Sequence, residues 1–229
     1  MKRFSYWLAA LMAVALIATA CGGDDDSADG SDLALVSSGT LTVCTDSPYP
    51  PMEFEQDGEF TGFDIELMRA IADDLGLDLA VNNIGFDPIT SGIAMESGEC
   101  DIAAASITIT DEREENIDFS DPYFTADQSL LVATDAGISD LAGFSGRSLA
   151  VQSATTGEAY AKANAPSDAD VVSFDNPGDV FLALAAGDVD GVLQDIVPNA
   201  EYALNNPDAA ELVETYPTDE NYGLSLIHI

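Results

Sequence analysis

The spacing of apolar and polar residues from about position 39 onward alternates between the periods of strands and helices. Short β-rich runs predict strands at residues 41–45, 77–81 and 101–106. Helices are predicted over residues 64–75 and 88–97, and a short one begins at Thr110, a suitable N-cap. Apolar side chains share one face of the first helix, which Gly76 can cap: Ile65, Met68, Ile71, Ala72 and Leu75.

A second set of alternating elements follows from about residue 129. Strands are predicted at 129–133, 147–152, 171–174 and 189–193, and helices at 156–164, 177–186 and 195–205. Alternating strands and helices indicate the α/β class. Two similar blocks over some 200 residues favour two lobes over one large core.

The N-terminus has the pattern of a signal peptide over residues 1–20. Lys2 and Arg3 precede an apolar run at 4–17 that is short for a membrane span, and small residues follow at 18–20. Residues 21–38 then read as a flexible, acidic tether, because most of them are small or polar and cannot bury a core.

Two processing routes fit the end of this segment. Ala18-Thr19-Ala20 suits an ordinary secretory peptidase, whereas Cys21 in the next position resembles a bacterial lipobox. We favour lipidation of Cys21, although Ala18 stands where leucine is commoner. Lipidation would hold the protein at the outer face of the cell membrane. A periplasmic location is the alternative.

The charge of the chain is strongly one-signed. Lys and Arg number 6 against 42 Asp and Glu, and removal of residues 1–20 would change the net charge from −36 to −38. Four cations would remain: Arg69, Arg113, Arg147 and Lys162. Because affinity for phosphate comes from Lys and Arg, this composition argues against nucleic acid as a partner.

Several phrases, in order and spacing, resemble the polar amino acid family of extracytoplasmic solute-binding proteins of ABC transporters (family 3). They are "GTLTVCTDSPYPPMEFEQDGEFTGFDIELMRAIADDLG", "SGECDIAAASITITDEREENIDFSDPYF", "LAGFSGRSLAVQSATTGEAYAK" and "AGDVDGVLQD", which with their spacing span nearly all of 39–223. The resemblance implies a periplasmic-binding-protein-like fold of type II. Lobes at 39–127 and 128–220 would be joined by hinge strands near 124–130 and 221–224 and would close over one ligand. It also implies a monomer that needs no cofactor and delivers its ligand to a membrane permease.

The chemistry of an α-amino acid indicates which side chains to seek. A carboxylate in a dry cleft calls for a guanidinium and N–H donors, and Arg113 follows a predicted strand and adjoins a new helix N-terminus. An ammonium calls for a buried carboxylate, and Asp195 ends the strand in "VLQD". The resemblance places the carboxylate-binding and ammonium-binding residues at these two positions. For either residue alone, a solvated surface role would be the default.

Further polar contacts are expected from both lobes. Ser106 and Thr108 should contribute a carbonyl and a hydroxyl from the first lobe. Thr155 and Thr156, at the start of a helix, should bring donors to the carboxylate, and N-capping there would be compatible. The family often has glycine where Ala154 and Thr156 stand.

The resemblance assigns the side-chain pocket to Asp46, Tyr49 and Phe86, an acid and two aromatics around the ligand. Asp46 could pair with a cationic side chain or accept from a neutral amide, and the sequence leaves both open. Gln152 replaces a lysine found in some glutamine binders. An acidic ligand is disfavoured, because no second cation matches the pocket.

The cysteines Cys44 and Cys100 could pair in an oxidising compartment. If their strands are parallel neighbours, Cys44 lies level with Ala104, about 13 Å from Cys100 at about 3.3 Å per residue. That distance exceeds the reach of a disulfide, so we expect two buried, unpaired thiols.

The last residues, 221–229, are expected to begin a return to the first lobe, where the family continues with a strand and helices. Residues 224–229, "LSLIHI", back-translate as CTG TCT CTT ATA CAC ATC, a widely used transposase adapter sequence. We therefore expect adapter read-through, with an ordinary strand-forming tail as the alternative. His228, the single histidine, would then carry no function.

Two other functions are alternatives to ligand capture. Relatives on this scaffold include a cyclohexadienyl dehydratase, and the lobes also occur as sensors of receptors. The sequence has no catalytic histidine, no Ser-His pair and no pattern of metal ligands, so we predict a binding protein rather than an enzyme.

Overall fold

The computed structural model describes residues 33–226. The predicted signal peptide, the lipidation site at Cys21, most of the tether and His228 lie outside the described residues. Within residues 33–226, none of the helices combines the length and apolar character needed to cross a membrane.

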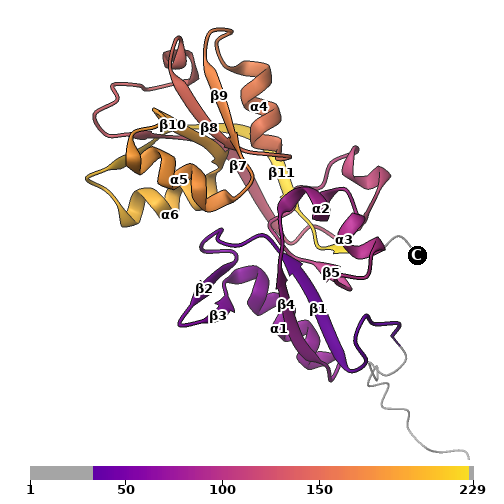
Figure 1. Cartoon of the computed structure of the whole chain (residues 1–229). Helices are drawn as coiled ribbons and strands as arrows, with labels where there is room; N and C mark the ends of the chain where they lie inside the picture. The colour runs from indigo at the N-terminus through magenta and orange to yellow at the C-terminus, as the bar shows by residue number, and fades with distance from the viewer. Residues whose placement is uncertain (1–32, 227–229) are drawn as a thin grey trace, which may run out of the picture.

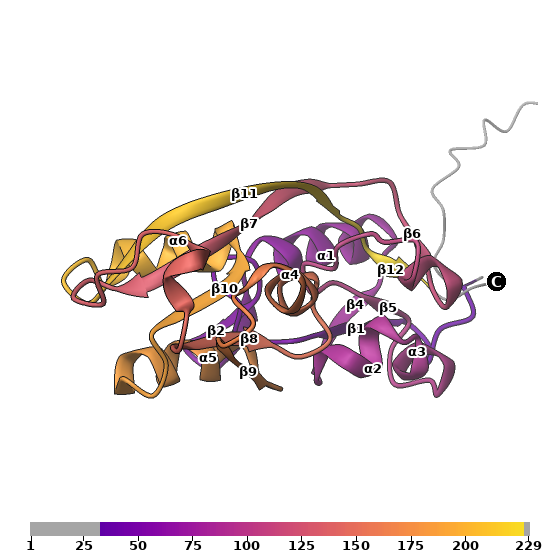
Figure 2. The same ribbon diagram turned by 90° about the horizontal axis from the view of Figure 1, so that it is seen from above.

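The first lobe is built on a five-stranded sheet in the order β4-β1-β5-β12-β6. Figure 1 labels β4, β1 and β5 of this sheet, and Figure 2 also labels β6 and β12. Its strands are β1 (Thr40–Thr45), β4 (Asp78–Asn83), β5 (Ile102–Ala103), β6 (Asp118–Phe119) and β12 (Ser225–Leu226). β1 is parallel to both β4 and β5, whereas β12 is antiparallel to β5 and β6. A small hairpin of β2 (Phe54–Gln56) and β3 (Glu59–Thr61) precedes helix α1 (Phe63–Asp74).

Apolar side chains cover both faces of this first sheet. α1 buries the predicted residues Met68 and Ala72 in one cluster, which also contains Val43. The other face carries α2 (Phe86–Thr90) and α3 (Ile93–Glu96), and there Cys44 belongs to the core. The successive residues Val43 and Cys44 therefore face opposite sides of the sheet, as the pleat of a strand requires.

The second lobe contains a five-stranded sheet in the order β11-β7-β10-β8-β9. Its strands are β7 (Phe124–Ala133), β8 (Ser148–Gln152), β9 (Asp170–Phe174), β10 (Gly191–Asp195) and β11 (Ala210–Tyr222). The helices α4 (Thr156–Asn164) and α5 (Pro177–Ala186) have the predicted bounds, and α6 (Ile196–Asn205) begins one residue later than predicted. Asn176 caps α5 and Thr155 caps α4, each with a side-chain oxygen. Such capping residues are a local pattern, so the sequence predicts where these two helices begin.

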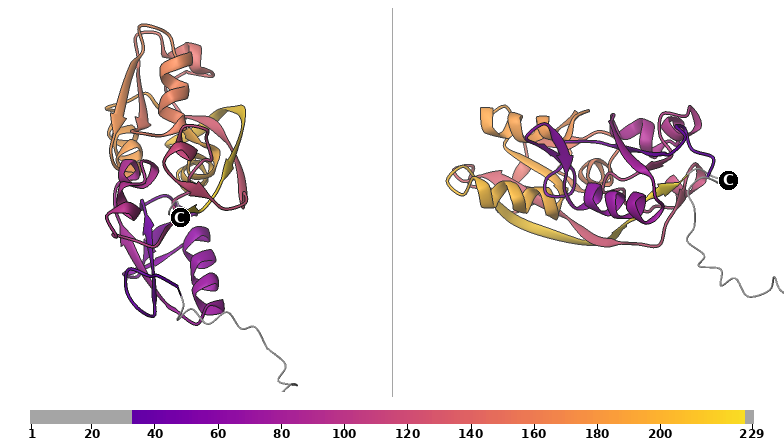
Figure 3. Two further views of the ribbon diagram at one scale, coloured as in Figure 1. Left: turned by 90° about the vertical axis from the view of Figure 1, so that its right-hand side faces the viewer. Right: turned by 90° about the horizontal axis from the view of Figure 1, so that it is seen from below.

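Two long strands, β7 and β11, cross between the lobes side by side (Figures 2 and 3). They pair antiparallel from Ala133 and Ala210 in the second lobe to Phe124 and Tyr222 beside the first. The pairing slips between Tyr216 and Glu220. The strand β11 was not predicted, because its mixed polar and apolar residues lack a clear period.

Two differences from the predicted helices have local causes. The helix predicted over residues 88–97 is two short helices, because Gly92 between them has a φ of 79° and lies close to the carbonyl of Asn116. The short helix expected from Thr110 is a 3₁₀ turn over Arg113–Glu115. The Thr110 hydroxyl accepts from the backbone N–H of Arg113 at 3.2 Å, but the N-cap of the turn is Glu112, whose side chain makes no capping hydrogen bond.

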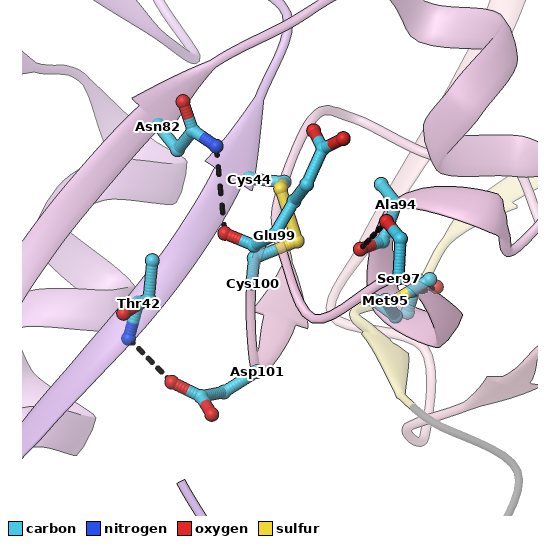
Figure 4. The surroundings of a disulfide bond; sticks show 10 residues. Thr42, Cys44, Asn82, Ala94, Met95, Ser97, Glu99, Cys100 and Asp101 are labelled. Carbon is cyan, nitrogen blue, oxygen red and sulfur yellow. Dashed lines mark hydrogen bonds between the residues drawn. A yellow bond between two sulfur atoms is a disulfide. The ribbon is translucent and has the colours of Figure 1, made fainter. Parts of the chain in front are cut away.

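Cys44 and Cys100 form a disulfide, so the prediction of two unpaired thiols is wrong (Figure 4). Their Cα atoms lie 5.6 Å apart. The expected parallel pairing is present within one residue, because Cys44 pairs with Ala103. The error lies in extending the strand back to Cys100, since β5 contains only Ile102 and Ala103.

The chain before β5 bends across β1 instead of continuing as a strand. The side chain of Asn82, the partner of Cys44 on β4, donates to the carbonyl oxygen of Glu99 at 3.4 Å (Figure 4). The Asp101 carboxylate accepts from the backbone N–H of Thr42 at 2.8 Å. These contacts bring Cys100 over Cys44, an arrangement that strand spacing alone could not reveal.

Replacing Cys44 and Cys100 together with alanine should lower the free energy of unfolding. The disulfide spans a sequence separation of 56 residues, and constraining such a loop in the unfolded chain stabilises a fold by about 2–4 kcal/mol. Denaturant unfolding with and without a reductant measures the difference. The double variant serves as the control, because it should not respond to reductant. A wild-type protein equally indifferent to reductant would contradict the assignment.

Candidate ligand-binding site

A small cavity lies between the two lobes. All nine residues predicted to bind the ligand line it: Asp46, Tyr49, Phe86, Ser106, Thr108 and Arg113 from the first lobe, and Thr155, Thr156 and Asp195 from the second. Other residues that line it are Glu53, Ala105, Gln152, Gly157 and Gln194. The two lobes therefore bring together residues up to 149 positions apart in the chain.

Arg113 points into the interior rather than toward its acidic neighbours. The residue is 8% exposed, and its guanidinium donates to the carbonyl oxygens of Thr108 at 2.7 Å and Ala154 at 3.1 Å. Its carbon Cζ lies 5.1 Å from the centre of the Phe86 ring. Burial lowers the pKa of Arg113, and the nearby Asp195 opposes that effect. A guanidinium nevertheless stays protonated in proteins, so the cavity keeps one fixed positive charge.

The four acids beside Arg113 in the sequence face solvent: Asp111, Glu112, Glu114 and Glu115 are all exposed. Among residues 33–226, no carboxylate lies within ion-pair distance of the Arg113 guanidinium. The two carbonyl contacts come from different lobes, so Arg113 also bridges the closed cleft. Its planar group remains suited to a carboxylate from outside the chain.

Asp195 lies at the end of β10, where it also precedes the first residue of α6. Its carboxylate accepts from the hydroxyl of Tyr49 at 3.0 Å, from the side-chain amide of Gln128 and from the hydroxyl of Tyr222. Burial, followed by the nearby Glu220, raises the pKa of Asp195 to about 6, although these three hydrogen bonds lower it. The donors come from the first lobe and from both crossing strands, so Asp195 is held by every part of the protein that meets at the cleft.

The hydroxyl protons of the predicted site are already committed to acceptors within the protein. Ser106 donates to Glu53 at 3.2 Å, and Thr155 donates to the carbonyl oxygen of Gln152 at 2.7 Å. Thr108 and Thr156 both donate to Glu220, at 2.9 Å and 2.6 Å. Donors suited to a ligand carboxylate are the Arg113 guanidinium and first-turn backbone N–H groups of α4, which have no partner within the helix; that of Glu158 donates to Thr155.

Asp46 makes a second connection across the cleft. Its carboxylate accepts from the side-chain amide of Gln152, on the other lobe, at 2.5 Å. Burial raises the pKa of Asp46 to about 7, and this hydrogen bond only partly opposes the shift. Gln152 thus occupies the place beside Asp46 that a ligand side chain with hydrogen-bond donors could take.

The loop before α4 follows a path that usually requires glycine. Ala154 has a φ of 61°, in the left-handed region, at one of the two positions where the family often has glycine. This conformation turns the Ala154 carbonyl toward Arg113. Gly157, at the next turn, has no room for a side chain, since a Cβ there would lie 2.9 Å from Oε1 of Gln128.

Sequence reasoning missed a set of buried acids behind the first lobe's side of the cavity. Glu53 is 1% exposed and Asp64 is fully buried, and both contact Ser106, whose backbone N–H donates to Asp64 at 2.8 Å. Burial raises the pKa of Glu53 well above its usual range and that of Asp64 to about 6. Among 42 acids, no pattern in the sequence separated these two from the solvated ones.

The fold and the cavity define a two-lobed binding protein whose ligand is enclosed between hinged α/β domains. The model of bacterial extracellular solute-binding proteins, family 3, matches residues 41–206. The chain therefore belongs to this family, and the predicted type II periplasmic-binding-protein fold is confirmed. Proteins of this family are extracellular or periplasmic solute-binding proteins.

Curated relatives bind several different amino acids. The chain is 32% identical to the ABC transporter glutamine-binding protein GlnH of Bacillus subtilis, over 98% of this chain and 85% of GlnH. It is 29% identical to a probable histidine-binding protein of Neisseria gonorrhoeae, over 96% of this chain and 83% of the relative. The match to the arginine-binding extracellular protein ArtP of B. subtilis, at 29% identity, covers 70% of this chain but only 60% of ArtP.

Solved structures with the same fold include several arginine binders. The arginine-bound form of truncated ArgBP from T. maritima is 31% identical with a TM-score of 0.77, covering 83% of this chain and 89% of that one. An ancestral arginine-binding protein has been solved with arginine, at 36% identity and a TM-score of 0.76, covering 83% and 85% of the two chains. An ancestral arginine-binding protein has also been solved with glutamine.

The buried acids predict that the ligand-free protein loses stability as the pH rises. The pKa of Asp46 is about 7 in the folded state and near 3.8 when unfolded, so the folded state holds more protons between these values. The stabilisation is complete below the unfolded pKa and is lost as the pH rises through about 7. At about 1.4 kcal/mol per pH unit, Asp46 should account for a loss of up to about 3 kcal/mol between about pH 5 and pH 8.

Urea unfolding at the two pH values tests this expectation with matched variants. Asp46→Asn keeps an acceptor for Gln152 and should show a smaller loss than the wild type. Asp188→Asn, at an exposed position, removes the same charge and should behave as the wild type. Equal losses in the wild type and Asp46→Asn would show that Asp46 titrates normally.

Proposed function

We propose that this solute-binding protein captures a polar amino acid with a cationic side chain, of the arginine type, and delivers it to the permease of an ABC importer. The carrying observation is the distribution of charge around one closed cavity. Arg113 supplies a single guanidinium, while Asp195 and Asp46 supply carboxylates from different lobes. The ligand carboxylate would bind Arg113, its ammonium Asp195 and its side chain Asp46.

The excess of buried acids favours a ligand with a second positive charge. A neutral amino acid would match Arg113 and Asp195 and leave Asp46 and Glu53 without a cation. A buried carboxylate without a cation is costly, and burial raises the pKa of both residues accordingly. A guanidinium or ammonium on the ligand side chain would remove that cost.

Glutamine is the second candidate ligand, because of the contact between Gln152 and Asp46. The amide of Gln152 already donates to Asp46, so a neutral amide can satisfy this carboxylate. The relatives support both candidates, since their names include arginine, histidine and glutamine binders and one structure holds an ancestral arginine-binding protein with glutamine.

We propose binding without chemical conversion of the ligand. The dehydratase alternative has some support, because one similar structure is an ancestral amino acid-binding protein described as a precursor of cyclohexadienyl dehydratase, at 34% identity and a TM-score of 0.75. The three donors around the Asp195 carboxylate favour its ionised form, the form that binds an ammonium, over a role in proton transfer.

Calorimetric titration with each of the twenty amino acids tests the proposal. We expect arginine to bind at micromolar concentration or tighter, glutamine more weakly, and aspartate and glutamate not at all. Mass spectrometry of the recovered ligand should find it unchanged. No binding by any of the twenty, or conversion of the ligand, would reject the proposal.

Arg113→Ala should weaken arginine binding by about 100-fold or more, because it removes a buried, charge-assisted contact to the ligand carboxylate. Arg69→Ala is the matched control, since Arg69 lies on the exposed face of α1, away from the cavity, where it pairs with Glu66 and donates to the carbonyl oxygen of Phe60. Its affinity should equal that of the wild type. An Arg113→Ala protein with wild-type affinity would remove Arg113 from the site.

The predicted anchor completes the proposal. We propose that lipid on Cys21 holds the binding domain near the permease through the tether, and that one chain suffices because both lobes of the cavity belong to it. Cys21→Ser should move the protein from the membrane fraction to the soluble secreted fraction on ultracentrifugation. Wild-type protein that is already soluble would favour ordinary secretion.

A further inference from the structure

Glu220 is a hinge residue that the proposed contacts to the ligand leave without a role. It lies on β11 immediately after the irregular pairing between Tyr216 and Glu220. In that segment Asp219 has a φ of 53°, and the backbone N–H groups of Thr218 and Asp219 donate to the carboxylate of Asp127 on β7. The bulge is therefore anchored to the neighbouring crossing strand, and its geometry sets the direction of the Glu220 side chain.

One carboxylate oxygen of Glu220 receives a hydroxyl from each lobe. Oε2 accepts from Thr108 of the first lobe at 2.9 Å and from Thr156 of the second lobe at 2.6 Å. The other oxygen, Oε1, accepts from the side-chain amide of Gln128 on β7 at 3.1 Å. Glu220, itself on β11, is thus hydrogen-bonded to both lobes and to the other crossing strand, β7.

The contacts to Glu220 use up the hydroxyl hydrogens of two residues that line the cavity. A threonine hydroxyl has one hydrogen to donate, and Thr108 and Thr156 both give theirs to Glu220. Both residues line the cavity, so they present only acceptor lone pairs to its interior. Oxygen acceptors suit the ligand's ammonium, whereas a carboxylate would be repelled there.

The same group of residues extends to the ammonium-binding carboxylate. The amide of Gln128 donates both to Glu220 and to Asp195. It also lies 3.3 Å from the hydroxyl oxygen of Thr156. Glu220 and Asp195 are therefore joined through one amide group, and the orientation of that amide depends on both carboxylates.

We propose that Glu220 is a positioning residue that latches the closed lobes and turns the Thr108 and Thr156 hydroxyls into acceptors for the ligand's ammonium. This inference rests on the proposed function. Two hydroxyls from different lobes can share one oxygen only when the lobes are closed, so these contacts stabilise the closed arrangement over the open one. Its loss should speed ligand release and leave ligand capture unchanged.

Glu220→Gln tests the latch with little change in shape. An amide has one acceptor oxygen, so it can receive the two hydroxyls or Gln128, but not both sets. We expect the dissociation rate of arginine, measured by stopped-flow fluorescence, to rise about tenfold or more while the association rate stays within twofold.

Glu211→Gln is the matched control, because Glu211 lies on the same strand, is exposed and loses the same charge. Thr156→Val, alone and combined with Glu220→Gln, separates the latch from a long-range charge effect. If Glu220 acts through the hydroxyl, the double variant should release arginine little faster than the faster single variant.

The outcomes distinguish the two proposals. Unchanged release from Glu220→Gln, or additive effects in the double variant, would overturn the role of Glu220 while leaving the binding function intact. A wild-type protein that binds no amino acid in the same titration would reject the binding function and the latch together.

Discussion

The structure depends on the burial of carboxylates around a cleft that holds a single guanidinium. Asp195 shows how the protein makes this tolerable, because its carboxylate takes hydrogen bonds from one lobe and from both crossing strands. Ionised groups survive away from water only when such partners surround them. The two lobes and the hinge must therefore come together for the charges of the cavity to be satisfied, which couples the electrostatics of the site to closure.

Closure also decides which groups remain available to a ligand. Arg113 donates to a carbonyl of the opposite lobe, and Asp46 accepts from Gln152 across the same cleft. Each contact occupies a group that an incoming amino acid could use instead. Ligand binding would then replace contacts between lobes with contacts through the ligand, and the affinity would reflect the difference between the two sets.

The disulfide in the first lobe strengthens the frame that carries part of this site. Cys44 is the penultimate residue of β1 and lies two residues before Asp46, and Cys100 lies at the start of the segment that leads to Ser106. Linking them joins the two chain segments that bring an acid and a hydroxyl to the same side of the cavity. The two cysteines belong to a buried cluster of the first lobe that also contains the cavity residues Phe86 and Ala105. The disulfide therefore stabilises the part of the lobe that forms one side of the cavity.

The sequence by itself determined the α/β class, most helices and the nine residues that meet at the cavity, because helix caps, apolar spacing and family phrases are local patterns. Only the tertiary structure decided the Cys44–Cys100 bond, the path of β11, the burial of Glu53 and the hydrogen bonds of Glu220. These features depend on a bend, a bulge and burial, which arise from contacts between distant segments. A buried carboxylate and a solvated one look alike in a chain with 42 acids, and only packing separates them.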